Sequence, residues 1–403
     1  MRLYRSTTRP QILYSCPVFA IRKTPWRHLE SIQNKAVRAL LQDMKTFSYL
    51  LNLMLLAIWI NGSPVVGGEG GKSVLCHIEA NAVLRPQENA RFTPEDLDLT
   101  ICTHVVYNRA TISPELTLVP RNAEVDLQDG GGLVPSKSPP ERLAGGMINR
   151  GLALKDIKPK LQVYLDIFDD EKELGKQQLG LEEAAPILKE EFVRRGLKLI
   201  LFHLPEEIHR IEKYELGEAF SRNFDLIIVG SYWKMPFGQT EILASVAALE
   251  SAVDGLTRRG IPPQKLVVAI PAFSVTMKLC NRTDAGIHSA ICGEGSEGTI
   301  GPLEMMIYDI ELRRKISNAS EDWVVTRDEE SKMSYGHSRS LQWGSFEDIE
   351  SVRAKAQFIL ERNLAGAAIM NVDMEDFKGA FTEGGETFPL TRAAFNALNG
   401  EQP

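Results

Sequence analysis

The sequence lacks features that define several common classes of protein. It contains no apolar run of about 20 residues, the length that a membrane-spanning helix requires. It shows no internal repeat of about 20–50 residues, which argues against a solenoid or a propeller. The formal net charge is −7 over 403 residues, so there is no electrostatic reason to expect nucleic acid as a partner. What remains is a globular chain long enough for one large domain or two ordinary ones.

Positive charge is concentrated at the start of the chain. Residues 1–43 contain eight Lys or Arg and two acids, a net of +6, so residues 44–403 sum to −13. The segments RSTTRPQILYSCPVF and HLESIQNKAVRAL in this head resemble the tail of reverse transcriptases from non-LTR retrotransposons. No polymerase carboxylates accompany them, so the resemblance implies no activity. We expect residues 1–43 to be a foreign or disordered basic extension.

A short apolar run, FSYLLNLMLLAIWI, occupies residues 47–60. Met44–Lys45 precede it and the small residues Gly62–Ser63 follow it, which is the order typical of a secretory signal. We therefore expect a signal peptide at residues 44–63, a Gly-rich linker at residues 64–73 and an extracellular mature protein. A buried helix or a signal anchor is the alternative for the apolar run.

The cysteines agree with export. Cys16 precedes the expected signal, and four cysteines follow it, at Cys76, Cys102, Cys280 and Cys292. An even number after a signal predicts two disulfides in an oxidising compartment. The tripeptides beginning at Asn281 and Asn318 have the Asn-x-Ser/Thr pattern of glycosylation acceptors, which matters only for a secreted chain.

Short β-rich runs alternate with helical patterns along the rest of the chain, which predicts a parallel α/β fold. Their near-continuous Val, Ile and Leu character indicates strands buried on both faces. The runs are Val74–Ile78, His104–Tyr107, Leu161–Ile167, Leu197–Leu204, Leu226–Tyr232, Leu266–Ile270 and Ala367–Val372. Apolar residues at helical spacing lie between them, from Ile242 to Leu256 and from Ile349 to Ile359.

Four segments in a fixed order carry a family resemblance. They read VLCHIEANAVLRPQENARFTPEDLDLTICTHVVY, FDLIIVGSYWKMPF, KLVVAIPAFSVTMKL and SLQWGSFEDIESVRAKAQFILERNLAGAAIMNVDMEDFKGAF. They resemble segments of glycoside hydrolase family 18, the chitinase family. The resemblance implies a TIM-type (β/α)8 barrel over residues 74–398, with a small α+β insertion at about 274–335 before the last strand. It also implies a Cys76–Cys102 disulfide between strands 1 and 2, and Cys280 is then expected to pair with Cys292 across a short loop.

The acid motif of that family is degenerate here. The family reads D-x-x-D-x-D-x-E along strand 4, where the Glu protonates the leaving oxygen and the Asp two residues earlier holds the substrate's acetamido group. Its four acid positions align with Lys198, Leu201, His203 and Pro205. Shifting the frame to Glu206 or Glu207 still leaves no carboxylate two residues earlier. We therefore expect no catalytic residue; Glu206 and Glu207 are weak candidates, and the pattern favours their role as first-turn acids that complement a helix dipole.

Other positions that contact sugar in the family have also changed. The strand-3 motif S-x-G-G corresponds to Asp166–Asp169, and the strand-7 motif Y-G-R corresponds to Phe273–Val275, which lacks the Arg. Met370 stands where the family has the Trp beneath the −1 sugar, and Asp373 matches the family's Asp that follows this Trp. Asp373 is therefore a candidate substrate contact.

The strand-6 motif M-x-Y-D becomes Gly230–Trp233, which keeps the Tyr as Tyr232. Tyr232 and Trp233 are candidates to stack on a sugar, because aromatic faces suit that contact. The alternative is that both side chains fill the mouth of the barrel.

The chain is also short between strands 4 and 6. About 20 residues separate Pro205 from Phe224, and a crossover between parallel strands needs at least 10–12 residues, so one helix fits there but not helix, strand and helix. The segment IHRIEKYELGEAFSR reads as that helix. We expect strand 5 to be missing, so that strand 4 lies beside strand 6 or a gap separates them.

These patterns predict a secreted chitinase-like monomer without hydrolase activity, cofactor or metal. Its expected partner is chitin or a chito-oligosaccharide, with no nucleic acid and no membrane association after signal cleavage. By resemblance, such proteins act as chitin-binding lectins or as growth and immune factors. The alternatives are an active chitinase that cleaves β-1,4 N-acetylglucosamine links with Glu206 or Glu207, and a non-functional product of a decayed or mis-assembled gene.

Overall fold

The structure, a computed structural model, describes 11 segments of the chain with gaps between them. These are residues 71–112, 118–120, 122–126, 146–168, 200–204, 222, 224–230, 238–296, 298, 300 and 306–400. The predicted basic extension at residues 1–43, the signal peptide at residues 44–63 and most of the linker at residues 64–73 lie outside this part, so these boundaries stay predictions.

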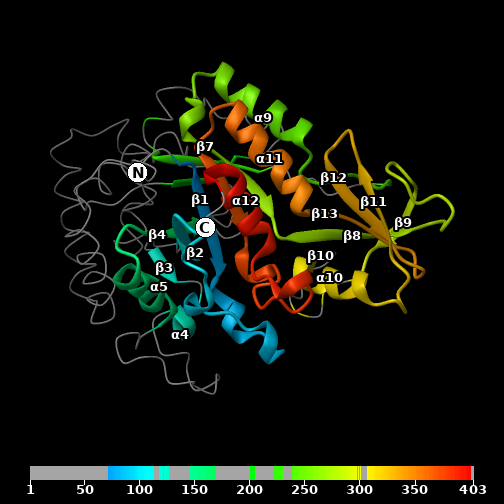
Figure 1. Cartoon of the computed structure of the whole chain (residues 1–403), viewed down its shortest axis with the longest axis horizontal. Helices are drawn as coiled ribbons and strands as arrows, with labels where there is room; N and C mark the ends of the chain where they lie inside the picture. The colour runs from blue at the N-terminus through cyan, green and yellow to red at the C-terminus, as the bar shows by residue number, and fades with distance from the viewer. Residues whose placement is uncertain are drawn as a thin grey trace, which may run out of the picture.

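A mostly parallel sheet forms the centre of the molecule (Figure 1). Its order is β3-β2-β1-β14-β7-β6-β5, with β4 also paired to β2; of these eight strands, only the short β3 is antiparallel to its neighbour. Every predicted β-rich run overlaps one of the parallel strands. The bounds are β1 (Ser73–Glu79), β2 (His104–Ile112), β3 (Leu118–Pro120), β4 (Gln162–Phe168), β5 (Ile200–Leu204), β6 (Leu226–Val229), β7 (Leu266–Pro271) and β14 (Gly366–Met370).

The sheet places β5 directly beside β6. The two strands pair in parallel, with Ile200 opposite Leu226 and Leu204 opposite Val229. This neighbourhood is the one expected if strand 4 of the barrel lies beside strand 6. Residues 205–221 fall outside the described residues, so the absence of a strand there stays a prediction. At the other end of the sheet β4 approaches β5, and among the described residues no hydrogen-bonded ladder joins the two.

Helices cover the outer face of this sheet (Figure 1). Ser245 caps α9 by accepting a hydrogen bond from the Ala248 N–H, so the helix begins at Val246, after the first apolar residue of the predicted stripe. Asp348 caps α11 through the Ser351 N–H. The helices are α4 (Ala123–Asp126), α5 (Met147–Ile157), α9 (Val246–Arg258), α11 (Ile349–Glu361) and α12 (Pro389–Asn399), and the short 3-10 turns are η2 (Ala80–Leu84), η3 (Glu88–Ala90), η4 (Pro94–Asp96), η7 (Pro263–Lys265), η8 (Val372–Met374) and η9 (Glu383–Gly385).

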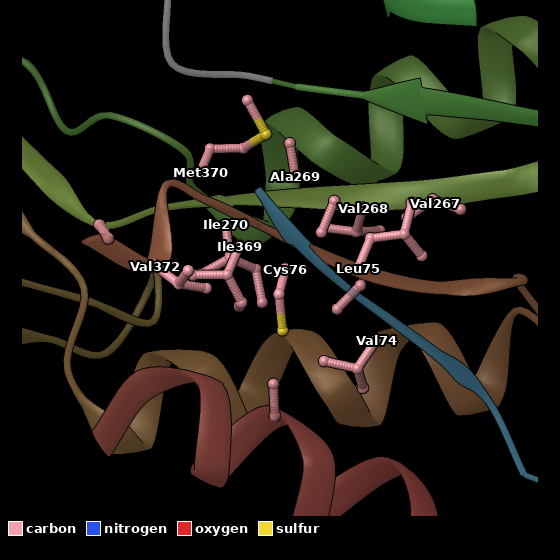
Figure 2. Packing of buried hydrophobic residues seen from close by; sticks show 14 of the residues in the cluster. Val74, Leu75, Cys76, Val267, Val268, Ala269, Ile270, Ile369, Met370 and Val372 are labelled. Atoms are coloured by element: carbon pink, nitrogen blue, oxygen red, sulfur yellow. The ribbon is translucent and has the colours of Figure 1, made fainter. Parts of the chain in front are cut away.

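The central strands are buried on both faces, as their sequences predict. Val74, Leu75 and Cys76 of β1 have no exposed surface. Figure 2 shows them beside Ile369 of β14, with Val74 and Cys76 directed toward the helices that pack below the strand. Two apolar faces on one strand require a covering layer on each side, which explains why helices alternate with strands along this chain.

A second, antiparallel sheet occupies the chain between β7 and β14. Its order is β10-β8-β13-β12-β11, with β9 also paired to β8, and it projects from one side of the first sheet (Figure 1). The predicted insertion at about 274–335 lies inside this unit, which extends further, to Phe346. Its elements are β8 (Phe273–Leu279), β9 (Ile291–Glu294), β10 (Met306–Tyr308), α10 (Asp309–Ser317), β11 (Val324–Asp328), β12 (Met333–His337) and β13 (Gln342–Phe346).

Both predicted disulfides are confirmed. Cys76 and Cys102 are bonded, with their Cα atoms 5.8 Å apart, and this bridge ties β1 to the segment that leads into β2. Cys280 and Cys292 are bonded at a Cα separation of 4.8 Å, which closes the loop between β8 and β9. In the loop-entropy account, closing 26 residues contributes roughly 3 kcal/mol to stability.

Candidate functional site at the carboxyl ends of the strands

The site expected from the sequence lies where the parallel strands end, because parallel-strand barrels carry their ligands at that face. β5 supplies two of the four acid-motif positions, Leu201 and His203. Its sequence, Ile-Leu-Phe-His-Leu, contains no carboxylate. Lys198, Pro205, Glu206 and Glu207 lie outside the described residues, so the roles considered for them stay predictions.

The candidate aromatic residues are also outside the described part of the chain. β6 ends at Val229, and the backbone is described again from Gly238 onward, so Tyr232 and Trp233 fall in the gap. Their stacking on a sugar stays a prediction. Met370, which replaces the Trp beneath the −1 sugar, is the last residue of β14 and is almost fully buried.

Asp373 lies in η8, just after β14, and has no exposed surface. One carboxylate oxygen accepts a 2.8 Å hydrogen bond from the Glu79 N–H at the end of β1. The other forms an ion pair with the buried Arg85 guanidinium. Burial raises the pKa of Asp373, and the Arg85 charge and the Glu79 N–H offset part of that rise. Any influence of Asp373 on a bound sugar therefore passes through its two partners.

Arg85 is the residue that the sequence reasoning missed. It stands between η2 and η3, and its Nη1 donates to the Asp373 backbone oxygen at 2.6 Å and to the Ala90 oxygen at 3.0 Å. Its guanidinium carbon lies 4.9 Å from the centre of the Tyr308 ring, at the end of β10. Burial raises the pKa of Tyr308 to about 12, so its hydroxyl stays protonated at neutral pH. Arg85 thus contacts the segment after β14 and the end of β10 in the second sheet, and Asp373 extends this network to the end of β1.

Two further polar pairs involve residues near the ends of β1 and β2. The Asn108 amide donates to the Glu79 carboxylate at 3.4 Å. The Tyr107 hydroxyl donates to Asp126 at 2.6 Å, and burial together with the Asp126 charge raises the pKa of Tyr107. Glu79 is partly exposed, so it is a carboxylate that a polar ligand at this face can reach. Each of these groups is held by a hydrogen bond to a neighbour.

Comparison with known proteins identifies the class of fold. The sequence model described as "Glycosyl hydrolases family 18" matches residues 176–375. "Probable chitinase 10" of Drosophila melanogaster is 27% identical over 374 residues, which cover 81% of this chain and 16% of that protein. "Chitinase-3-like protein 2" of Homo sapiens is 23% identical over 354 residues, which cover 77% of this chain and 89% of that protein. The chain therefore spans a small part of the first relative and most of the second.

Solved structures agree on the architecture. Catalytic domain 2 of a group II chitinase from Ostrinia furnacalis superposes with a TM-score of 0.70 at 19% identity, covering 82% of this chain and 97% of that chain. Human YKL-39, described as "a pseudo-chitinase with retained chitooligosaccharide binding properties", superposes with a TM-score of 0.65 at 20% identity, covering 81% of this chain and 99% of that chain. Together these findings show that the chain is similar to family 18 glycosyl hydrolases over residues 176–375 and shares the TIM-barrel-like fold of these chitinase structures.

Proposed function

We propose that the chain is a secreted, non-hydrolytic member of this class that binds chito-oligosaccharides at the carboxyl ends of its barrel strands. The observation that carries the proposal is β5 (Ile200–Leu204), which contains no acid and places Leu201 and His203 at two of the family's four acid positions. A general acid and charge stabilisation each contribute roughly 100-fold or more, so losing both removes useful turnover.

Sugar binding is supported by the relatives that share the fold. Human YKL-39 is described as retaining chitooligosaccharide binding, and its structure was determined in the presence of such sugars. Sugar binding needs hydrogen-bonding groups and apolar faces. It does not need the acid motif that hydrolysis requires, in which a carboxylate lies two residues before the catalytic Glu. Glu79, which accepts a hydrogen bond from the buried Asn108 amide, supplies such a polar group at this face, and Tyr232 and Trp233 are the aromatic candidates.

Secretion is supported by the two disulfides, which are rare in reducing compartments. Among the described residues, no helix has the length and apolar character to cross a membrane. The candidate signal at residues 44–63 supplies the route of export. Recovery of a secreted protein that begins near Pro64 is the expected result of N-terminal sequencing.

Hydrolysis assays distinguish this proposal from an active chitinase. We expect no turnover of a fluorogenic chitotriose by the wild-type protein, and no change in Glu206→Gln or Glu207→Gln. A catalytically active family 18 chitinase, assayed in parallel, controls for the substrate. Measurable hydrolysis that either substitution abolishes would establish the alternative enzyme instead. A protein that neither hydrolyses nor binds the sugar would favour the alternative of a decayed gene product.

A further inference from the structure

The outer strand of the second sheet exposes an apolar edge. Within the part of the chain that the structure describes, β11 ends the strand order and pairs on one side with β12. Val324 is 47% exposed and Val325 is 45% exposed, and Thr326 beside them is also exposed. An edge strand presents unpaired N–H and C=O groups, so an exposed Val-Val-Thr edge is a template for pairing with another chain. Soluble proteins usually blunt such edges with charge, a bulge or a cover.

Two glycosylation sequons flank this edge. Asn318 lies at the C-terminus of α10, six positions before Val324. Asn281 lies in the loop closed by the Cys280–Cys292 disulfide, far from β11 in sequence. The Arg282 guanidinium forms a 3.2 Å ion pair with Asp322, two residues before Val324, which brings the Asn281 loop to the same end of the sheet.

The electrostatics of His337 agree with that placement. His337 is the cross-strand partner of Val324. Burial lowers the pKa of His337, and the Arg282 charge lowers it further while Asp322 opposes the shift. The charge of Arg282 therefore acts on His337 of β12, the strand that pairs with β11. Asn281, Asn318 and β11 share one end of the second sheet.

Both acceptor asparagines are exposed and held in the same local geometry. The Asn281 Oδ1 atom accepts hydrogen bonds from the Thr283 N–H and hydroxyl, each at 3.0 Å. The Asn318 Oδ1 atom accepts from the Ser320 N–H at 3.1 Å and from its hydroxyl at 2.9 Å. These bonds engage Oδ1 and leave Nδ2, the atom to which a glycan attaches, outside the contacts.

We propose that Asn281 and Asn318 carry N-linked glycans that cover the β11 edge and keep the secreted chain monomeric. Bulky, hydrated glycans at these surface asparagines would keep strands of other chains from pairing with β11, as charged side chains do on other edge strands. The donor is an oligosaccharide linked to a polyprenyl diphosphate. The bond between its anomeric carbon and the diphosphate oxygen breaks, the diphosphate leaves with the electron pair, and the anomeric carbon bonds to Nδ2, which releases one proton.

This inference rests on the export included in the proposed function and is independent of sugar binding. The full chain is translated in the presence of endoplasmic-reticulum microsomes, and protease protection reports translocation. We expect a protected product with two glycan mass increments, of which Thr283→Ala removes one and Ser320→Ala removes the other. Alanine keeps the backbone N–H bond to the Asn. The matched controls Thr283→Ser and Ser320→Thr retain the sequons and both increments.

Sedimentation of the protein secreted from cultured cells tests the cover itself. We expect the glycosylated protein to be a monomer, the Thr283→Ala/Ser320→Ala protein to associate, and the addition of Val325→Lys to restore the monomer. An unprotected product overturns export and this inference together, whereas a protected product lacking either increment overturns only the glycan assignment. A monomeric aglycosyl protein, or association that Val325→Lys leaves unchanged, overturns the cover.

Discussion

Replacing Glu347 with alanine is expected to lower the free energy of unfolding by about 3–5 kcal/mol, because it leaves a buried cation without its partner. Glu347 follows β13 and forms an ion pair with Lys355 of α11, and neither side chain has exposed surface. Lys355 Nζ also contacts the Met333 sulfur at 3.0 Å, and the Ser351 hydroxyl donates to Glu347 at 2.5 Å. A thioether alone cannot compensate an ammonium ion.

The charges of this pair are mutually dependent. Burial raises the pKa of Glu347 and lowers the pKa of Lys355, and each partner's charge opposes the shift of the other. The double variant Glu347→Leu/Lys355→Met removes both charges and is expected to lose much less stability than Glu347→Ala alone. The exposed pair of Glu329 and Lys332 provides a matched control, and Glu329→Ala should change stability by less than about 1 kcal/mol.

Guanidinium unfolding, followed by tryptophan fluorescence, measures these differences. Lys355 lies on α11, a helix of the barrel, and its contact with Met333 reaches β12 of the second sheet. The Glu347–Lys355 ion pair therefore stabilises the junction between the second sheet and the barrel. Asp348 reinforces the same junction by pairing with Arg327 of β11 at 3.1 Å while it caps α11. If Glu347→Ala were no more destabilised than Glu329→Ala, the buried pair would contribute nothing to this junction.

The substitution Arg85→Ala is expected to cost a similar amount, about 3–5 kcal/mol at neutral pH. It leaves the fully buried Asp373 carboxylate with the Glu79 N–H as its remaining partner among the contacts described above. Without the cation, the pKa of Asp373 rises further above its unfolded value. The variant is therefore least destabilised at acid pH, where Asp373 is protonated in both states, and loses stability as pH rises.

A pH series of unfolding measurements tests this expectation. Arg353→Ala is the matched control, because Arg353 pairs with Glu350 on the exposed face of α11, where both side chains are more than half exposed. Adding Asp373→Asn to Arg85→Ala should recover part of the lost stability at neutral pH. A loss for Arg85→Ala that is independent of pH would mean that Asp373 is not the group left unpaired.

Much of the fold was predictable from local patterns. Runs such as Leu226–Tyr232 and Leu266–Ile270 are rich in Val, Ile and Leu, and both overlap strands buried on each face. The cysteine positions, read with the family resemblance, predicted both disulfides correctly. Strand ends were less predictable, because Val372 continues the apolar run of β14 but belongs to η8. Apolar character does not indicate where the backbone turns away from its neighbour.

The polar site was harder to predict than the core. Arg85 carries no motif of its own, and its role depends on Asp373, which lies 288 positions away in the sequence. A buried ion pair of this kind requires the closed geometry of the first and last barrel strands. Asp373 matched a family position and was expected near the sugar, whereas its carboxylate is enclosed by Arg85 and Glu79. Alignment identified the position but not its solvent access.

Calorimetric titration of the secreted protein with chitohexaose, followed by mass spectrometry of the recovered sugar, tests the central claim most directly. We expect saturable binding and recovery of intact hexasaccharide after prolonged incubation. A catalytically active family 18 chitinase, treated identically, should convert the sugar to shorter products. Shortened products from this protein, or no binding by a protein whose Cys76–Cys102 and Cys280–Cys292 bridges are intact, would contradict the account.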